Sequence, residues 1–315
     1  MLQAVCPSTL PSLDGTVCPL SAWCTHRVGG RGRVKSLTQG LIPLSFTLMD
    51  DRFPVVRVGE EYLSYQKTGK GKPLFCLHGW AGHERTFDGI LPFFNPHFRI
   101  YQLAWPGFGS ARLRRGRYSL DDMVRWVDRF REHFGFRKIY LMGNCIGANV
   151  ALEYAYQHRE RLKALIINEP HGFMPAYFYL LIYPVIGDVL LRALFKIPPG
   201  RSLIMSMFPL EDEEGTGYTE RRLAEVPTSS MAAFLRAMYL YARETNAYAR
   251  PKIKVPTIFP LPQKTFVQVA VFERLYGRCF TNLEVAPVEG EVHNPVVEDP
   301  HAFARAVLPH LGIRK

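Results

Sequence analysis

The stretch Gly143-Asn144-Cys145-Ile146-Gly147 decides the fold of this chain of 315 residues. The residues before it, 138–144, are typical of a strand, and residues 146–158 are typical of a helix. A strand that turns at once into a helix needs a strained backbone, and glycines on both sides leave room for neighbouring chain. The pattern therefore predicts a sharp turn that presents the Cys145 side chain, with Gly143 and Gly147 as supporting residues.

A thiol at this turn suits covalent chemistry. The N-terminus of a helix carries partial positive charge, which stabilises a thiolate at Cys145. The thiolate is the reactive form of cysteine and attacks carbonyl carbon atoms. Cys145 is therefore a candidate nucleophile. The alternative is that Cys145 is an inert buried thiol.

The chain beyond this stretch alternates strands with helices. A Ser119–Asp122 pair matches the capping-box pattern at the start of a helix. The alternation predicts an α/β fold with a mostly parallel sheet covered on both faces. Strands are predicted at 53–58, 61–66, 73–78, 98–104, 138–144, 162–168, 255–260 and 283–288, and helices at 119–133, 146–158, 265–276 and 300–311.

The predicted organisation has three parts. Residues 1–48 lack periodicity and are expected to be a disordered extension. Two alternatives are a start at Met49 and a transit peptide, which the basic residues between 27 and 35 suggest. Residues 49–170 and 251–315 are predicted to form the core, and residues 171–250, which lack the strand–helix alternation, a helical lid.

Three more motifs follow predicted strands. His78-Gly79-Trp80 ends the strand at 73–78, and Trp-Pro-Gly-Phe-Gly-Ser, residues 105–110, follows the strand at 98–104. Gly-Glu-Val-His-Asn-Pro, residues 290–295, follows the last strand. The chain has ten histidines, and an isolated histidine is more often structural than catalytic. His293 differs from the other histidines because it lies between the last predicted strand and the last predicted helix.

Together these motifs resemble the α/β-hydrolase superfamily, in the branch with a helical lid after the sixth strand, over about residues 54–312. The resemblance implies an eight-stranded-type sheet flanked by helices. It implies that Cys145 is the nucleophile and His293 the general base. It further implies that the backbone N–H groups of Trp80 and Ile146 form the oxyanion hole, with His78 and Gly79 supporting that loop.

The chain departs from the superfamily's pattern at the nucleophile and at the acid. Most members have serine at the position of Cys145, whereas polyhydroxyalkanoate synthases, whose elbow is similar to this one, and dienelactone hydrolases use cysteine. The triad aspartate expected after the seventh strand is absent from residues 260–265, where Thr265 lies near its position. Ala104-Trp105 replaces the aspartate that usually precedes Pro-Gly-x-Gly.

Glu169 is the candidate for a relocated acid, because it ends the predicted strand at 162–168. Parallel strands end at one edge of the sheet, and some superfamily members carry the acid at this strand. The alternative is that Glu169 is only a polar loop residue. A thiol, with a pKa of about 8.5, also needs a well-oriented base less than a serine hydroxyl does.

Residues 176–195 are strongly apolar and about long enough to span a membrane. Pro184, Gly187, Asp188 and Arg192 interrupt the segment, and a buried aspartate in lipid costs a few kcal/mol. Two amphipathic lid helices with a break at Pro184 are therefore predicted. Contact with a membrane surface or with an apolar substrate also fits this composition.

Charge and cysteine content indicate which partners, cofactors and cellular location to expect. The net charge is +11, but no nucleic-acid-binding motif accompanies the scattered basic residues, so no nucleic-acid partner is expected. The six cysteines lack metal-ligand spacing, and Cys76 lies in an apolar strand where a core position is expected. We expect no metal or cofactor, and a cytoplasmic location with membrane association left open.

Two classes of function follow from the sequence. The first is an enzyme that hydrolyses, or transfers the acyl group of, an ester or thioester with an apolar acyl part. The second is a catalytically degenerate protein that binds a hydrophobic ligand or a partner. The intact elbow glycines and His293 favour the enzyme, whereas the missing aspartates favour the degenerate protein.

Overall fold

The computed structural model describes residues 53–80, 82–170, 178–183, 185–207, 223–244, 250, 252–262, 279–290 and 294–313. All of them belong to the compact unit Asp50–Lys315. The predictions for residues 1–48, for the helix at 265–276, for Thr265 and for His293 fall outside the described residues.

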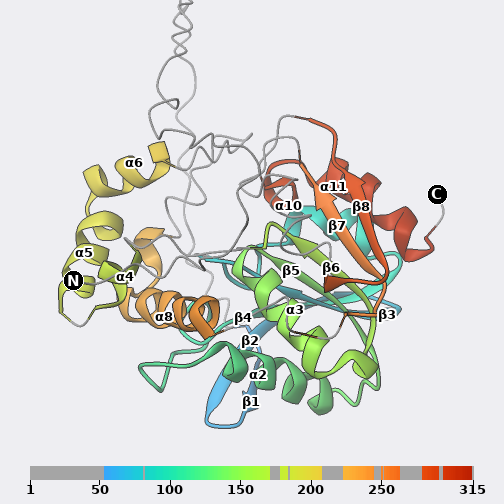
Figure 1. Ribbon diagram of the computed structural model, residues 1–315, viewed down its shortest axis with the longest axis horizontal. Coiled ribbons are helices and arrows are strands. Elements are labelled where there is room, and N and C mark those ends of the chain that lie inside the picture. Colours follow the sequence, from blue (N-terminus) through green and yellow to red (C-terminus); the bar gives the residue numbers. More distant parts are fainter. Residues whose placement is uncertain are drawn as a thin grey trace, which may run out of the picture. The chain divides into compact units, whose positions relative to one another are not determined.

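One eight-stranded sheet forms the centre of the part of the chain that the structure describes (Figure 1). The strand order is β1-β2-β4-β3-β5-β6-β7-β8, antiparallel from β1 to β4 and parallel from there to β8. This confirms the predicted fold class. The strands β1 to β8 span Val55–Val58, Glu61–Gly69, Lys72–Leu77, Phe98–Ala104, Ile139–Asn144, Leu162–Asn168, Thr257–Leu261 and Leu283–Pro287.

Alternate strand residues pack into cores on opposite faces of the sheet. Phe75 and Leu77 of β3 belong to one core, and Leu74 and Cys76 belong to the other. Cys76 is fully buried, and burial raises the pKa of its thiol, which confirms the predicted core position. The helices α2 (Leu120–His133) and α3 (Ile146–Gln157) cover one face, and α1 (Leu91–Phe94), α10 (Pro295–Glu298) and α11 (Pro300–Val307) cover the other (Figure 1).

Helix α2 begins with the capping box that the sequence predicts. The Ser119 hydroxyl accepts a hydrogen bond from the Asp122 N–H at 3.1 Å, and the Asp122 carboxylate accepts one from the Ser119 N–H at 2.8 Å. Two backbone donors at the helix start are thereby satisfied. The Asp122 carboxylate also lies favourably at the positive end of the helix dipole.

Two predicted element boundaries differ from the structure at prolines. Strand β7 begins at Thr257 and not at 255, and Pro256 just before it has no N–H to donate to a neighbouring strand. The helix predicted over 300–311 is α11 followed by a 3-10 turn, Leu308–Leu311. Pro309 lies in that turn and cannot donate the next α-helical hydrogen bond.

The described residues between β6 and β7 include a series of helices. These are α4 (Phe178–Ile182), α5 (Ile186–Leu191), a π-helix (Arg192–Lys196), α6 (Pro198–Met207) and α8 (Thr228–Glu244). The division into a core and a lid over 171–250 stays a prediction. Among the helices that the structure describes, none has the length and apolar character that a membrane span requires.

Two helices, α4 and α5, lie before and after Pro184 in the chain as predicted, and their outer side carries the polar Asp188 together with apolar side chains. Leu181 and Leu191 face the core, but the outer side of α4 and α5 is largely apolar as well. Val185 is 79% exposed and Val189 is 61% exposed. The apolar run is long enough to supply both sides of the helices, which leaves few polar residues for the outer side.

Candidate functional site

Cys145 lies in a strained turn between β5 and α3. Its φ is 56° and its ψ is −123°, a conformation that residues with a side chain rarely adopt and that costs about 1–3 kcal/mol. The side chain is partly exposed, whereas Asn144 and Ile146 on either side are buried. The turn therefore presents the thiol at the carboxyl edge of the sheet, as the sequence predicts.

The two elbow glycines are required by close backbone contacts. A Cβ on Gly143 would lie 2.3 Å from the carbonyl oxygen of Gly147, and a Cβ on Gly147 would lie 2.1 Å from that of Leu77. Both distances are far below van der Waals contact with atoms that cannot easily move. Any side chain at these positions would displace α3 from β3 and β5, which confirms the steric role predicted for both glycines.

The loop after β3 passes directly beside the thiol. A Cβ on Gly79 would lie 2.5 Å from the Cβ of Cys145 and 3.0 Å from its Sγ. Only a glycine allows this approach. The loop that was predicted to supply an oxyanion donor thus lies next to the candidate nucleophile, although its catalytic role stays a prediction.

His78 holds this loop in place. Its buried imidazole accepts a hydrogen bond from the Trp105 N–H at Nε2, over 3.2 Å, and its Nδ1 lies 2.7 Å from the Gly79 carbonyl oxygen. The pattern assigns a neutral imidazole with its proton on Nδ1. Trp105 in turn donates its indole N–H to the His78 carbonyl oxygen over 3.0 Å. The Trp105 that replaces the usual aspartate therefore braces the loop.

The two predicted oxyanion residues belong to the two segments that meet at Cys145. Ile146 is the first residue of α3, where backbone N–H groups have no acceptor within the helix. Trp80 follows Gly79, and its ring contacts the Phe195 ring edge to face with centroids 4.9 Å apart. The contact joins the loop beside the thiol to the helices between β6 and β7.

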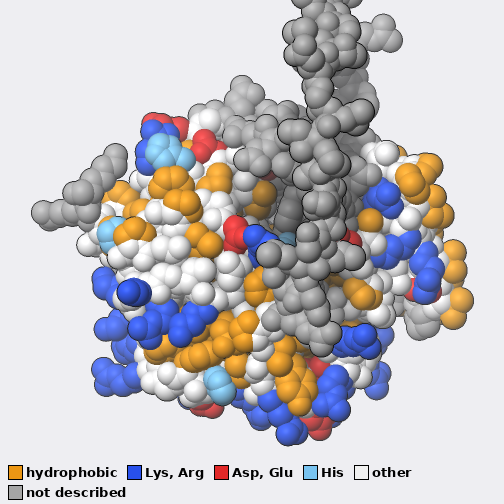
Figure 2. All heavy atoms as spheres, turned by 180° about the vertical axis from the view of Figure 1, so that it is seen from behind, with side chains coloured by type: hydrophobic (Ala, Val, Ile, Leu, Met, Phe, Trp, Pro, Cys, Tyr) orange, Lys and Arg blue, Asp and Glu red, His pale blue; other side chains and the backbone are white. Residues whose placement is uncertain are grey.

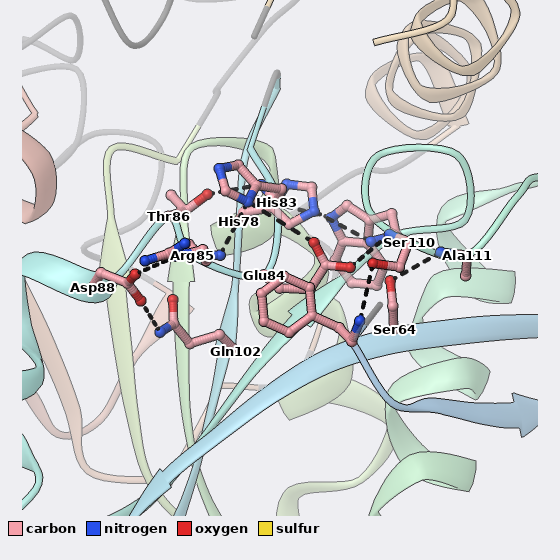
Figure 3. A network of polar contacts seen from close by, with 12 residues as sticks. Ser64, His78, His83, Glu84, Arg85, Thr86, Asp88, Gln102, Ser110 and Ala111 are labelled. Atoms are coloured by element: carbon pink, nitrogen blue, oxygen red, sulfur yellow. Dashed lines mark hydrogen bonds and ion pairs between the residues drawn. The ribbon is translucent and has the colours of Figure 1, made fainter. Parts of the chain in front are cut away.

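Further buried polar contacts anchor the segment after this loop (Figure 3). Glu84 is only 2% exposed and accepts the Ser110 N–H at 2.7 Å, which joins the segment to the loop after β4. Gln102 on β4 donates to the Asp88 carboxylate at 2.8 Å. Sequence reasoning did not single out Glu84, because a lone glutamate in a turn resembles an ordinary solvated loop residue.

Glu169 follows β6 and lies close to the elbow along the sheet edge. Asn168 and Asn144 are register partners in the pair β5–β6, and the Cys145 N–H donates to the Asn168 carbonyl oxygen at 2.9 Å. Glu169 is 5% exposed and has a positive φ of 48°, unusual for a glutamate. Glu169 therefore follows the residue that accepts the Cys145 N–H, at the same edge of the sheet.

Three asparagine side chains join the segments that carry the candidate residues. The Asn168 amide donates to the Asn144 side-chain oxygen at 2.7 Å and to the Asn294 side-chain oxygen at 3.4 Å. Each asparagine is the chain neighbour of a candidate, namely Cys145, Glu169 or His293. No sequence motif marks this network, since its members come from distant parts of the chain.

The other described thiols differ from Cys145. Cys76 and Cys279 are buried, and burial raises the pKa of both. Cys145 is partly exposed at the edge of the sheet, which leaves it open to a reagent or substrate. Across the described residues, no cluster of His, Cys, Asp and Glu could hold a metal ion.

Comparison with known proteins identifies the fold. The family model of the alpha/beta hydrolase fold matches residues 72–197. The crystal structure of a hydrolase from Pseudomonas aeruginosa superposes with a TM-score of 0.68 and 20% identity, covering 84% of this chain and all of that one. The chain therefore has the α/β-hydrolase fold.

Curated relatives match over shorter stretches. A pimeloyl-(acyl-carrier protein) methyl ester esterase of Nitrosomonas europaea is 33% identical over 103 residues, which cover 32% of this chain and 38% of the esterase. Monoacylglycerol lipase abhd6-B of Xenopus laevis is 30% identical over 115 residues, 34% of each chain. This chain thus spans about a third of the length of these curated relatives.

Proposed function

We propose that the chain is an enzyme that hydrolyses an ester or thioester, or transfers its acyl group, through Cys145. The observation that carries the proposal is the backbone of Cys145, held at φ 56° and ψ −123° with its thiol partly exposed between β5 and α3. Strain of this kind is retained where it aims a reacting group. The names of the two curated relatives, a methyl ester esterase and a monoacylglycerol lipase, support an ester substrate.

In the first half of the proposed reaction, His293 accepts the thiol proton of Cys145 while the sulfur attacks the carbonyl carbon. The carbonyl electron pair moves to the oxygen, which accepts hydrogen bonds from the Trp80 and Ile146 N–H groups. The oxyanion then collapses and breaks the bond to the alcohol or thiol, which leaves with the proton held by His293. An acyl thioester at Cys145 remains.

In the second half, water or another acceptor attacks the thioester carbonyl carbon while His293 takes the acceptor's proton. Collapse of the second oxyanion breaks the carbon–sulfur bond, and His293 returns the proton to the Cys145 sulfur. Glu169 is proposed to orient His293. Its burial beside Asn168, which contacts Asn294 next to His293, supports this assignment.

An apolar acyl part is the substrate feature that the surroundings favour. The Trp80 and Phe195 rings meet next to the loop beside Cys145, and Leu181 and Leu191 pack into the same core. Such a lining favours aliphatic or aromatic groups over charged ones. We also propose a cytoplasmic location, where thiols such as Cys145 stay reduced.

The test is acylation of the thiol. The intact chain is incubated with a panel of activated esters and thioesters of increasing acyl length, and adducts are located by mass spectrometry. We expect an adduct on Cys145 that disappears in Cys145→Ala, forms more slowly in His293→Ala, and is unchanged in the control Cys279→Ala, which removes a buried thiol. An adduct that persists in Cys145→Ala refutes the proposal.

The second candidate function is a degenerate site that binds a hydrophobic ligand or partner. The observation in its favour is the sequence from Pro260 to Thr265, which has no carboxylate where the usual triad acid stands. This candidate predicts that long-chain esters bind without being cleaved and that Cys145→Ala binds them equally well. Equilibrium binding measured beside the acylation assay separates the two functions.

A further inference from the structure

The outer side of α4 and α5 carries a dense group of exposed apolar side chains. Ten large hydrophobic side chains are exposed among the described residues, and six of these lie within the eleven residues 179–189. Val185 and Val189 have the largest exposed fractions, 79% and 61%. We call this surface the apolar face; it consists of Tyr179, Leu180, Tyr183, Val185, Ile186 and Val189.

Core packing does not account for the apolar face. Leu181 and Leu191 already fill the inner side of these helices, and Phe195 of the π-helix that follows is buried against Trp80. A surface helix ordinarily has a polar outer side, and helices that are apolar all round are buried by something. An exposed apolar surface of this density marks a site of contact with a partner or a membrane.

The charges beside the apolar face indicate which partner it meets. Among the described residues from Phe178 to Met207 there are three cations and a single carboxylate, Asp188. Lys196 donates to the Ala224 and Val226 carbonyl oxygens, and Arg201 donates to that of Lys196, so Arg192 is the cation whose side chain is most exposed. The Asp188 carboxylate is engaged by Arg192 at 2.8 Å. Figure 2 shows Lys and Arg side chains next to hydrophobic ones along the right-hand edge, where these helices lie.

An apolar surface with surplus positive charge matches an anionic lipid bilayer. Its apolar side chains can enter the boundary between headgroups and acyl chains, and Arg192, whose side chain is 65% exposed, can pair with a lipid phosphate. A second copy of this chain fits less well, because it would bring the same cations face to face. The net charge of +11 for the whole chain acts in the same direction.

We propose that the apolar face docks on the surface of a membrane that contains anionic phospholipids, with α4 and α5 lying in the interfacial plane. Both helices are far too short to cross a bilayer, so they bind at its surface. The proposal does not depend on the reaction assigned to Cys145. Together, the two would let an apolar ester reach the thiol from the lipid phase.

The test uses the full chain and large vesicles of phosphatidylcholine, alone or mixed with phosphatidylserine, followed by sedimentation. We expect binding to the mixed vesicles that weakens as salt is added. The triple substitution Val185→Ser, Ile186→Ser and Val189→Ser should reduce partitioning at least about tenfold. The matched control is Val55→Ser with Val285→Ser, which alters two valines that are 51% and 41% exposed elsewhere on the molecule and should leave binding unchanged.

Three outcomes would overturn the proposal. One is equal binding by the triple variant and the unaltered chain, and another is an equal loss in the control pair. The third is a chain that ignores vesicles but forms a dimer that the triple substitution abolishes in light scattering. Circular dichroism on heating verifies that each variant is folded.

The membrane-docking proposal and the proposed reaction can be refuted independently of each other. Cys145→Ala should bind vesicles like the unaltered chain, so a lack of acylation leaves the docking result intact. Conversely, the triple serine variant should still acylate Cys145 with a short water-soluble ester. Arg192→Gln should weaken binding to the anionic vesicles and not to the neutral ones, because it removes a cation whose side chain is 65% exposed.

Discussion

Backbone strain is concentrated at two residues of the candidate site. Among the described non-glycine residues, three have a positive φ, and Cys145 and Glu169 are two of these. They follow neighbouring strands at positions that are directly in register. Each costs about 1–3 kcal/mol that the surrounding structure must offset. The Cys145 N–H bond to the Asn168 carbonyl oxygen and the tight glycine contacts hold the turn in this state.

The first prediction at this scale concerns the sulfur itself. Cys145→Ser keeps nearly the same shape but replaces a thiol with a hydroxyl, which is a much weaker acid and needs a strongly oriented base. The usual acid is missing from residues 260–265, so we expect kcat/KM for an activated ester to fall by at least about a hundredfold. Steady-state kinetics measure this, and a serine variant as fast as the cysteine enzyme would show that thiol chemistry is not needed.

The second prediction concerns Asn168, which acts through other residues as a positioning group. Asn168→Ala leaves the side-chain oxygens of Asn144 and Asn294 without their donor, which costs about 1–3 kcal/mol in unfolding free energy. We expect kcat to fall at least about tenfold with little change in KM, because the segments that carry the candidate residues lose their shared bond.

The control for this prediction is Thr257→Val. The Thr257 hydroxyl donates a buried hydrogen bond of 2.9 Å to the Val255 carbonyl oxygen, and the substitution removes it. Thr257 is the first residue of β7, so this bond lies at the end of the strand away from the candidate site. This variant should lose stability without losing kcat. If both variants lower kcat equally, Asn168 only stabilises the fold and does not position the candidate residues.

Sequence reasoning reached part of the site for a physical reason. The elbow glycines and Cys145 are local in the chain, so a short motif carries their geometry. The asparagine network joins residues 24 and 126 positions apart, and nothing in a single sequence marks such pairs. The brace between His78 and Trp105 was missed for the same reason, because those residues are 27 positions apart.

At the scale of elements, local chemistry fixed most of the starts and ends. Strands β4 and β6 match their predicted residues, 98–104 and 162–168, because both are short, mostly apolar segments, Phe-Arg-Ile-Tyr-Gln-Leu-Ala and Leu-Lys-Ala-Leu-Ile-Ile-Asn. The helices around Pro184 were harder to predict. Asp188 is the only charged residue within α5, and α4 has none, so the sequence alone does not say which apolar side chains face the core.

The capping box of α2 gives a prediction at this scale. Ser119→Ala removes the hydroxyl that accepts the Asp122 N–H, so unfolding free energy should fall by about 1 kcal/mol. Urea unfolding followed by circular dichroism measures the change. Ser202→Ala, at an exposed position within α6, is the control and should cause no loss. Equal stability of Ser119→Ala and the unaltered chain would mean that the cap contributes nothing.

At the scale of the whole molecule, one carboxylate ties several elements together under the sheet. Asp128 of α2 accepts hydrogen bonds from Arg131 at 2.9 Å, from the Tyr154 hydroxyl of α3 at 2.9 Å, and from Arg161 just before β6. Burial alone would raise the pKa of Asp128. The hydrogen bonds from the two arginines and the tyrosine outweigh burial and lower the pKa to about 2.

This lowered pKa predicts how stability changes with acid. A carboxyl group whose pKa is lower in the folded state stabilises the protein above its unfolded pKa of about 4, and the contribution is lost as the pH falls toward 2. The shift corresponds to roughly 2 kcal/mol. Asp128→Asn should therefore lower the free energy of unfolding at pH 7 and much less near pH 2.5. The two losses should differ by roughly 2 kcal/mol. Urea unfolding at both pH values measures the two differences, and other carboxylates cancel because both proteins contain them. A stability difference that stays constant with pH would mean that the Asp128 charge does not hold these elements together.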